Sequence, residues 1–274
     1  MDGMIPTEAA IRIAAFLAIF GSMAIFELWS PRLERPEMHG AMKSRRWFTN
    51  LSMVVISSLV LRVAFPAAAV GAAVFAETRG WGLLRLLGAG GLVGGIIAFV
   101  VLDFAVWLEH VVSHKVPFLW RIHRMHHADT GFDVTTGLRF HPLEILLSMV
   151  WKAAIVIALG APVLAVLVFE IVLNGSSMFS HSNVRLGARI DRLLRRVIVT
   201  PDMHRVHHSA ERVETDSNYG FNFSFWDRLF GTYSDQPRRG HDAMMIGLTE
   251  YRGNKPAHIG WSLLLPFLSN RARQ

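Results

Sequence analysis

The chain has 274 residues, of which 52% are hydrophobic and 18% charged. Soluble proteins carry about 25% charged residues. The low share of charged residues and a mean hydropathy of +0.34 argue against an ordinary soluble domain. Lysine and arginine number 28 against 21 acidic residues, a net charge of +7, which in so apolar a chain we assign to an anionic membrane surface rather than to nucleic acid. Cysteine is absent, which excludes disulfides, zinc–thiolate sites, iron–sulfur ligation and cysteine nucleophiles within this chain.

Four apolar regions follow in chain order. The first, 9–29, is followed by basic residues and by no small-residue cleavage site, so we expect a retained anchor rather than a signal peptide. The second, 51–76, and the third, 83–112, exceed the roughly 20 residues that a span needs. The fourth, 145–179, is interrupted by Gly-Ala-Pro at 160–162. We therefore expect two helices joined by a tight turn, either two tilted spans or a re-entrant hairpin.

Basic residues between these regions predict the orientation. They gather in the 31–46 loop, in the 113–144 segment and after residue 180, whereas the loop between the second and third regions holds only Arg79 and Arg85. Because positive residues mark the cytoplasmic side, we expect the N-terminus outside and these three segments inside. All the clustered histidines would then lie on the cytoplasmic face.

A glycine-rich stretch at 88–95 superficially resembles a nucleotide-binding loop. It follows no predicted strand and lies within an apolar region. The four-residue spacings Gly90/Gly94 and Gly91/Gly95 are typical of close helix packing in lipid. We therefore expect helix packing here, and no phosphate-binding motif is recognised elsewhere in the sequence.

The segment 185–198, RLGARIDRLLRRVI, has apolar residues at helical spacing with arginines between them. Such a pattern is typical of an amphipathic basic helix lying among lipid headgroups. The alternative is a helix that packs on the rest of the cytoplasmic part and leaves its arginines in solvent. Both interpretations remain open at this point.

Histidine is the residue type that points to chemistry. Ten of the 13 histidines lie between 110 and 208, with H-x-x-x-H at 110–114 and H-x-x-H-H at both 123–127 and 204–208. Residues three or four apart on a helix share a face, so each H-x-x-H-H can offer ligands to two neighbouring ions. With His181 between them, these motifs supply nine imidazoles. Nine exceed the four ligands of a structural zinc site, and imidazole suits iron, zinc, copper or nickel. The histidines without such neighbours, which we treat as ordinary, are His39, His241 and His258.

Six motifs between Asp103 and Tyr233 form a more specific combination. They are HVVSH at 110–114, LWRIHRMHH at 119–127, RFHPLE at 139–144, FSHSN at 179–183, TPDMHRVHHS at 200–209 and NYGFNFSFWDRLFGTY at 218–233. Together they resemble the fatty acid hydroxylase/sterol desaturase superfamily of membrane di-iron oxygenases. Residues 1–100 resemble only generic membrane anchors.

The resemblance implies two iron ions, molecular oxygen and electrons from a separate donor protein, since no fused cytochrome segment is recognised here. Recombinant protein can carry zinc in the iron positions, and we recognise no haem or flavin site. It implies His141 either as an extra ligand or as a residue that supports the ligands. The nine ligands it implies are His110, His114, His123, His126, His127, His181, His204, His207 and His208.

Asp103 is a further candidate because it shares a helical stripe with His110 and His114, seven and eleven residues away. A carboxylate at that depth in lipid is costly and marks a functional site by default. Metal-bound histidines often donate their second nitrogen to a carboxylate. Since His110 lies roughly 10 Å along the axis, we expect Asp103 to bind a histidine from a facing segment or an ordered water. The alternative is a polar group in helix packing or in a substrate cavity.

Two other acidic residues are weaker candidates. Glu170 stands eleven residues before His181, an offset that predicts a similar supporting role. Asp227 lies in the aromatic segment 218–233, which either covers the metals or packs against the bilayer surface. We expect Asp227 to be buried and paired with Arg228 or another arginine.

These observations predict an all-α integral membrane bundle with a cytoplasmic histidine-rich di-metal cap. We expect anchoring helices at 1–100, a di-iron domain at 101–235 and a C-terminal tail at 236–274. The predicted function is hydroxylation of a C–H bond of a membrane lipid, with desaturation at the same site as the alternative. A membrane metal-dependent hydrolase is an alternative of another class, although such sites usually include acidic ligands. Histidines gathered beyond the spans argue against a metal transporter, and their number argues against a structural zinc scaffold. The oligomeric state and the particular lipid are left open.

Overall fold

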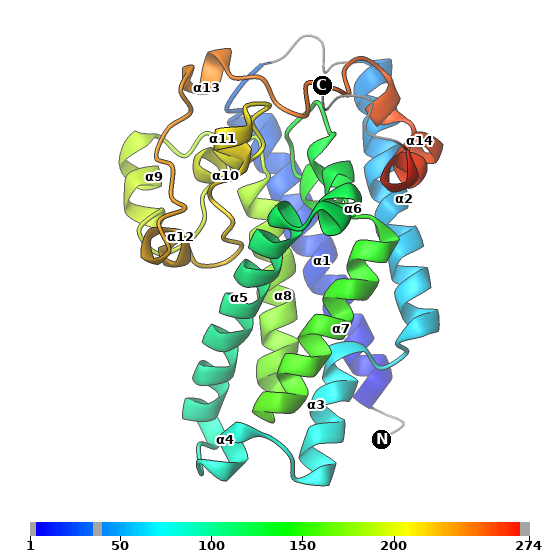
Figure 1. Ribbon diagram of the computed structural model, residues 1–274, viewed down its shortest axis with the longest axis vertical. Coiled ribbons are helices and arrows are strands. Elements are labelled where there is room, and N and C mark those ends of the chain that lie inside the picture. The colour runs from blue at the N-terminus through cyan, green and yellow to red at the C-terminus, as the bar shows by residue number, and fades with distance from the viewer. Residues whose placement is uncertain (1–3, 35–39, 269–274) are drawn as a thin grey trace.

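The structure, a computed structural model, describes residues 4–34 and 40–268, and every regular element in these ranges is helical. A bundle of long helices carries a cap of short helices and loops at one end (Figure 1). The bundle consists of α1 (Met4–Trp29), α2 (Ala41–Ala64), α3 (Ala68–Arg79), α5 (Gly91–Lys115), α7 (Pro142–Leu159) and α8 (Val163–Ser180), with α4 (Leu83–Leu86) at the far end. The cap consists of α6 (Pro117–His127), α9 (Ala188–Leu194), α10 (Pro201–His207), α11 (Arg212–Thr215), α12 (Phe225–Leu229), α13 (Gly240–Ala243), α14 (Ile259–Leu264) and the 3-10 helices η2 (Thr136–Leu138), η3 (Lys255–Ala257) and η4 (Leu265–Phe267).

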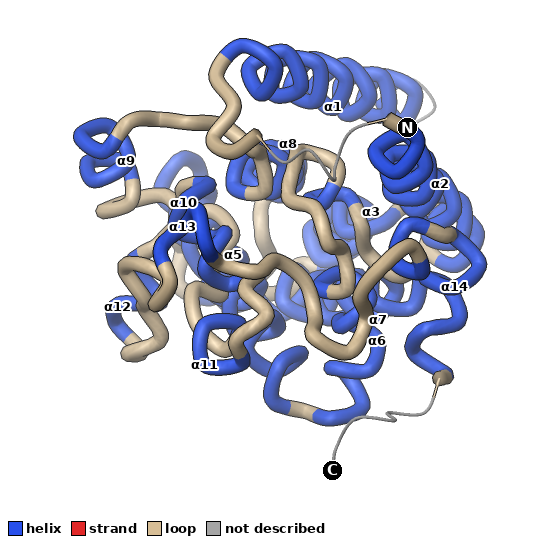
Figure 2. Tube along the Cα trace, turned by 90° about the horizontal axis from the view of Figure 1, so that it is seen from above, coloured by secondary structure: helices blue, strands red, loops and turns tan. Residues whose placement is uncertain are grey.

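Within the described residues, five segments are long and apolar enough to cross a membrane, and they run 8–29, 41–86, 91–115, 142–159 and 163–180. α1 packs against α8 and α2 against α7, whereas α3 and α5 each contact both α7 and α8. Seen from above, α1 lies along one edge of the bundle (Figure 2). Small side chains on α3 and larger ones on α5, α7 and α8 fill the core between them. The protein is therefore an integral membrane protein, as the sequence predicts.

The second apolar region differs from its prediction in where its helix starts and in being interrupted. α2 begins ten residues before the expected start at residue 51, because Arg46 and Asn50 point into a buried network rather than into solvent. The region is also broken in two, since α2 ends two residues before Pro66 and α3 begins two residues after it. Proline has no N–H for a helical hydrogen bond and clashes with the preceding turn.

The glycine-rich stretch forms a turn more than a packing face. Gly88 and Gly91 adopt φ of +65° and +59°, and α5 starts only at Gly91. A Cβ on Gly90 or Gly91 would meet no atom within 4 Å, so the expected packing through these two residues is wrong. Gly95 does face another helix, with its Cβ position 3.8 Å from the Cβ of Ala165 in α8.

The fourth apolar region forms two helices, as predicted. The turn between α7 and α8 contains Gly160 at φ +64°, and a Cβ there would lie 2.4 Å from the carbonyl oxygen of Trp81. Only glycine fits this close backbone approach. Each helix has 18 residues, or about 27 Å at 1.5 Å per residue, close to the hydrocarbon thickness of about 30 Å. Their length favours two spans over a re-entrant hairpin.

A buried polar network joins α2 to the loop that follows α6. The Arg46 guanidinium donates to Asp129 Oδ1 at 2.6 Å, to Asp133 Oδ2 at 2.5 Å and to Thr136 Oγ1 at 3.0 Å. Burial alone would raise the pKa of Asp133, but Arg46 and nearby hydrogen bonds outweigh it and lower that pKa to about 2. The network therefore holds ionised groups, and it positions the loop that leads from α6 to α7.

Removing Arg46 is expected to destabilise the protein strongly. Breaking a buried ion pair by deleting one partner costs about 3–5 kcal/mol, because it leaves an uncompensated buried charge. Arg46→Ala should therefore lower the thermal unfolding temperature measured in detergent. Arg45→Ala is the matched control, since Arg45 is exposed and should change that temperature little. Equal melting temperatures for both variants would contradict the importance of the network.

The chain beyond residue 235, expected as a tail, packs back onto the cap. Arg124 donates to the carbonyl oxygens of Leu265 and Leu268 at 2.7 and 2.8 Å. Arg139 donates to the carbonyl oxygen of Pro256 at 2.8 Å and to the hydroxyl of Ser262 at 2.7 Å. These contacts fix η3, α14 and η4 against α2 and α6.

The basic segment 185–198 is helical over a shorter range than expected, only through α9. Arg195 does not belong to a solvated face, because it is buried and forms ion pairs with Asp191 and Asp235. The apolar residues of the segment do not form the buried face either. Ile190 and Leu193 are 56% and 65% exposed.

Candidate metal centre

Nine histidines come together where the cap meets the bundle, and all nine are buried. They come from the end of α5, from α6, from the residue after α8 and from α10 with its C-cap. They form two groups, and within each group one ring nitrogen per residue lies within 4.8 Å of the others. The five-histidine group is His110, His114, His123, His127 and His207; the four-histidine group is His126, His181, His204 and His208.

The two H-x-x-H-H motifs divide between the groups in opposite ways. In α6 the outer pair belongs to the five-histidine group and the middle His126 to the four-histidine group. In α10 the outer pair belongs to the four-histidine group and the middle His207 to the five-histidine group. The helical spacing causes this division, since residues four apart share a face and the residue between them points aside. This is the arrangement that the sequence spacing predicts for two neighbouring ions.

Backbone carbonyls orient four of these rings. Each accepts a hydrogen bond from a histidine Nδ1, which leaves the Nε2 of that ring as an unprotonated lone pair. Metal-bound histidines usually show this pattern. The pairs are His110 with Tyr219 at 2.7 Å, His126 with Arg139 at 3.2 Å, His181 with Ser177 at 2.7 Å and His207 with Ser217 at 2.6 Å.

The resulting lone pairs face one another. Nε2 of His181 lies 3.2 Å from Nε2 of His126 and 3.1 Å from Nε2 of His204 and of His208. Since both His181 and His126 carry their proton on Nδ1, no hydrogen is left to join their Nε2 atoms, and the contact is repulsive without a cation. Nitrogens that bind one ion at about 2.1 Å lie about 3.0–3.4 Å apart. The donor set and its spacing therefore fit a metal ion.

Among the described residues, the carboxylates in contact with a clustered ring touch the five-histidine group. Glu144 Oε1 lies 2.6 Å from Nδ1 of His123, whose Nε2 is 3.1 Å from Nε2 of His127. Asp216 Oδ1 lies 3.4 Å from Nδ1 of His114. An anionic partner makes an imidazole a stronger donor than a carbonyl does. The two groups thus differ in both ligand number and electrostatic support.

Burial keeps six of the clustered imidazoles neutral, which is the form that binds metal. Burial is the largest cause that lowers the pKa of His181 to about 4 and that of His207 to about 3, and repulsion from neighbouring imidazoles adds to it. The same two causes hold the pKa well below its usual value in His126, His127, His204 and His208.

The metal-free protein is expected to lose stability on acidification. Below about pH 6.5 the unfolded chain binds protons on these histidines while the folded chain does not. The free energy of unfolding therefore decreases as the pH is lowered. Each such histidine contributes about 1.4 kcal/mol per pH unit between its unfolded and folded pKa values. The thermal unfolding temperature of chelator-treated protein should decrease steeply between pH 6.5 and pH 4. An unfolding temperature that stays constant over this range would contradict the burial argument.

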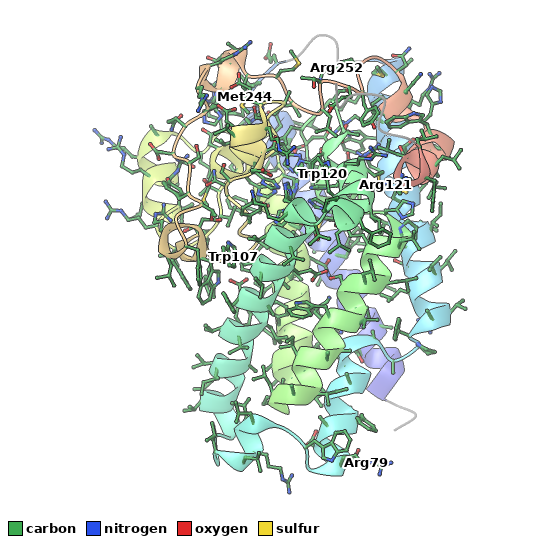
Figure 3. All side chains as sticks on the ribbon, in the orientation of Figure 1. Arg79, Trp107, Trp120, Arg121, Met244 and Arg252 are labelled. Carbon is green, nitrogen blue, oxygen red and sulfur yellow. The ribbon has the colours of Figure 1, made fainter. Side chains whose placement is uncertain are left out.

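Aromatic residues surround the two groups. Trp120 marks the cap side and lies above the level of Trp107 on α5 (Figure 3). Phe221 packs against the apolar core of the bundle and separates that core from the five-histidine group. The ring centroid distances are 4.9 Å for Trp120–His114, 4.5 Å for Phe140–His126, 5.3 Å for Phe132–His208 and 5.0 Å for Phe221–His110.

Asp227 organises the aromatic segment 218–233 without an arginine. Its carboxylate accepts hydrogen bonds from the backbone N–H groups of Tyr219 and Gly220, both at 2.9 Å, and from Trp107 Nε1 at 3.1 Å. Neither Arg228 nor another described arginine pairs with Asp227, so the pairing considered from the sequence is not found in this part of the chain. Burial raises the pKa of Asp227, and these hydrogen bonds oppose that shift. Since the Tyr219 carbonyl holds His110, Asp227 fixes a support of the site.

Asp103 also acts on the aromatic segment. Its Oδ2 accepts from Trp226 Nε1 at 2.8 Å and from the backbone N–H of Phe223 at 3.3 Å. The partners of this oxygen are thus residues of the cap and not a facing histidine. The carboxylate is buried as predicted, but its contacts tie α5 to the cap.

Two other sequence candidates, Glu170 and His141, lie apart from the two groups. Glu170 forms ion pairs with Arg12 at 2.6 Å and with Lys152 at 3.2 Å, so its contacts link α1, α7 and α8. His141 caps α7, with Nδ1 accepting from Leu143 N–H at 3.1 Å and Nε2 lying 3.2 Å from the Leu263 carbonyl oxygen. His241 and His258 belong to neither group, and His39 lies outside the described residues.

The supporting carboxylates are the functional residues that the sequence analysis missed. Glu144 belongs to the RFHPLE motif. Its position in the first turn of a predicted helix, where acidic residues are favoured, could have marked it as a candidate. Asp216 lies in a connection between short cap elements, where local spacing predicts no contact. Its proximity to His114 arises only in the folded chain.

Residues 95–232, half of the chain, match the family model of fatty acid hydroxylases. The chain belongs to the fatty acid hydroxylase family. This match confirms the resemblance to the fatty acid hydroxylase/sterol desaturase superfamily, and it contains all nine clustered histidines.

Curated relatives of this fatty acid hydroxylase family member are lipid-modifying enzymes. An ornithine lipid hydroxylase of Rhizobium tropici is 32% identical over 145 residues, which cover 52% of this chain and 42% of the relative. The human alkylglycerol monooxygenase is 30% identical over 155 residues, covering 56% of this chain and 32% of the relative. A cholesterol 25-hydroxylase-like protein of Danio rerio is 30% identical over 135 residues, covering 48% and 52%. The matched region thus spans about a third to half of these relatives, and no solved structure matches the chain.

Proposed function

We propose that this protein is a membrane-bound di-iron oxygenase that hydroxylates a C–H bond of a lipid. The observation that carries the proposal is the pair of buried all-histidine groups at one end of a membrane-spanning bundle. The family match and the hydroxylase and monooxygenase relatives support the same reaction class. A hydrolytic metal site usually includes acidic ligands, whereas no carboxylate belongs to either group.

The five- and four-histidine groups would each hold one iron ion. When bound, the two ions would supply the activation of molecular oxygen. In the overall reaction one oxygen atom enters the C–H bond and the other leaves as water, which consumes two electrons and two protons. The electrons would come from a separate donor protein. The same site could instead remove two hydrogens and leave a double bond.

The residues of this chain prepare the site in three ways. Buried neutral imidazoles remain ready to bind metal, since their pKa values are low. The carbonyls of Tyr219 and Ser217 fix the rings of His110 and His207. The aromatic residues exclude water, and Phe221 stands where an acyl chain in the bundle would meet the five-histidine group. Such a chain would approach from the apolar side of Phe221.

The proposal is tested by metal analysis and lipid mass spectrometry on one preparation. Purified protein should contain about two irons per chain, and cells that express it should contain a lipid heavier by one oxygen than control cells do. A lipid lighter by two hydrogens would instead identify a desaturase. A single zinc per chain with unchanged lipids, also after iron reconstitution, would refute an oxygenase.

We further propose that the cap faces the cytoplasm, which the distribution of basic loop residues supports. The chain has no cysteine, so single cysteines report topology cleanly. Thr78 and Val213 are exposed at opposite ends of the molecule, and Arg79 next to Thr78 marks the far end of the bundle from the cap (Figure 3). An impermeant maleimide on intact cells should label Thr78→Cys and spare Val213→Cys. The reverse result would overturn the orientation.

A further inference from the structure

The lower edge of the cap carries an exposed apolar surface beside α5. It consists of Ile190 and Leu193 of α9, Val197 just after it, Leu229 of α12 and Phe230 next to it. Their exposed fractions are 56%, 65%, 55%, 69% and 51%. In both views α9 and α12 lie outside the bundle on the side of α5 (Figures 1 and 2). We call these five residues the overhang.

The overhang lies at the level of the bilayer. The ring of Phe230 stacks on Trp107 at 4.6 Å and on Phe104 at 5.8 Å. At 1.5 Å per residue these two α5 residues lie about 20–24 Å from Gly91, where the helix starts. The hydrocarbon core is about 30 Å thick. If α5 spans the membrane from its first residue, Phe230 stands within the acyl region near its cap-side boundary.

The overhang also continues the outer surface of the spanning helices. Val93 and Ile97 share a helical stripe with Phe104 and are 62% and 38% exposed, so exposed apolar side chains lead along α5 towards the ring of Phe230. A patch of this kind in water would favour association or aggregation. Contact with the acyl chains removes it from water.

Arginines lie beside the apolar stripe of α9. On α9, Ile190 and Leu193 lie about 60° apart, and Arg189 and Arg192 fall within a neighbouring arc of similar width. Arg196 and Val197 follow in the turn after α9. All three arginines are exposed, whereas Asp191 and Arg195 turn inward and pair with each other. A helix with adjacent apolar and basic faces binds at the surface of an anionic bilayer. The same arginines would attract anionic headgroups.

We propose that the overhang inserts into the headgroup boundary of an anionic bilayer and that Arg189, Arg192 and Arg196 bind its phosphate groups. The membrane contact of the protein thus extends from the spanning helices to α9 and α12. It does not depend on a metal ion or on the proposed reaction. Its consequence for the site is direct, because α12 belongs to the aromatic segment whose Tyr219 carbonyl supports His110.

Single cysteines in this cysteine-free chain provide the test. Leu193→Cys and Leu229→Cys are labelled with bimane, and the full-length protein is reconstituted in vesicles of phosphatidylcholine and phosphatidylglycerol. Phosphatidylcholine brominated in mid-chain should quench both labels by roughly half or more, as expected of residues at the acyl boundary. Val213→Cys on α11 is the matched control, because it is also 65% exposed but lies higher in the cap (Figure 1). Its label should respond to aqueous iodide and not to the brominated lipid.

The arginines are tested in the same vesicles. Raising phosphatidylglycerol from none to an equimolar share should shift the emission of the Leu193→Cys label to the blue, and Arg189, Arg192 and Arg196 replaced together by glutamine should abolish that shift. Iodide quenching without bromolipid quenching at both Leu193→Cys and Leu229→Cys would overturn the proposal and leave the overhang open to a soluble protein. A shift that persists in the glutamine variant would overturn the role of the arginines.

Discussion

Replacing His207 by alanine is expected to remove metal from the five-histidine group and to abolish lipid oxidation. Its Nδ1 donates to the Ser217 carbonyl at 2.6 Å, and its Nε2 is buried without a hydrogen-bond partner. The His207 ring is therefore held with its Nε2 lone pair directed at the five-histidine group. His126→Ala should have the same effect through the four-histidine group, to which it belongs. A reaction that needs both ions would lose its activity in either variant.

Metal content and lipid products should be measured on the same preparations. Each alanine variant should retain less iron than the unsubstituted protein and yield no oxidised lipid. His258→Ala is the control, since His258 is exposed and belongs to neither group. Equal losses in all three variants would indicate damage to folding rather than loss of a ligand. Full iron content in His126→Ala or His207→Ala would contradict the ligand assignment.

Glu144→Gln is expected to weaken the five-histidine group selectively. The carboxylate lies 2.6 Å from Nδ1 of His123 and increases the electron donation of that ring. Glutamine keeps the size of the side chain but removes its charge, and loss of such a supporting partner typically costs about 10–100-fold in metal affinity or activity. Titration with a chelator should therefore show one metal released earlier and the second unchanged.

The matched control is Glu109→Gln. Glu109 is a neighbouring acidic residue on α5, and its carboxylate accepts a hydrogen bond from Ser148 Oγ at 3.1 Å. Its substitution should leave both release steps close to those of the unsubstituted protein. If Glu144→Gln released both metals equally early, the difference between the two groups would not depend on this carboxylate. If it changed neither step, His123 would not need its carboxylate.

Local spacing explains why the ligand groups could be predicted. Residues four apart share a helical face whatever the rest of the fold does, so the pairs His123/His127 and His204/His208 were predictable from the sequence. The apolar regions were predictable for a similar reason, because length and hydropathy alone decide whether a helix can span. The turn at Gly160 was visible from the Gly-Ala-Pro sequence that interrupts the helix.

Contacts between distant segments explain what could not be predicted. Asp103 lies on the same helical stripe as His110, but its carboxylate accepts hydrogen bonds from Trp226 and from the Phe223 backbone instead. The start of α2 depends on where Arg46 finds its acidic partners, and these follow some 80 positions later in the sequence. Neither contact leaves a periodic signal. The basic segment 185–198 has such a signal, but spacing alone does not say which face is buried.

The crossed assignment of the two H-x-x-H-H motifs has a consequence for how the ions are loaded. α6 and α10 each contribute to both groups, so neither group can be assembled without ordering both helices. The first ion to bind therefore meets most of the conformational entropy cost for the second, which is a source of positive cooperativity without any further change of shape. We expect metal-free protein to bind the second ion more tightly than the first, to an extent smaller than the weakening of about 10–100-fold expected for Glu144→Gln.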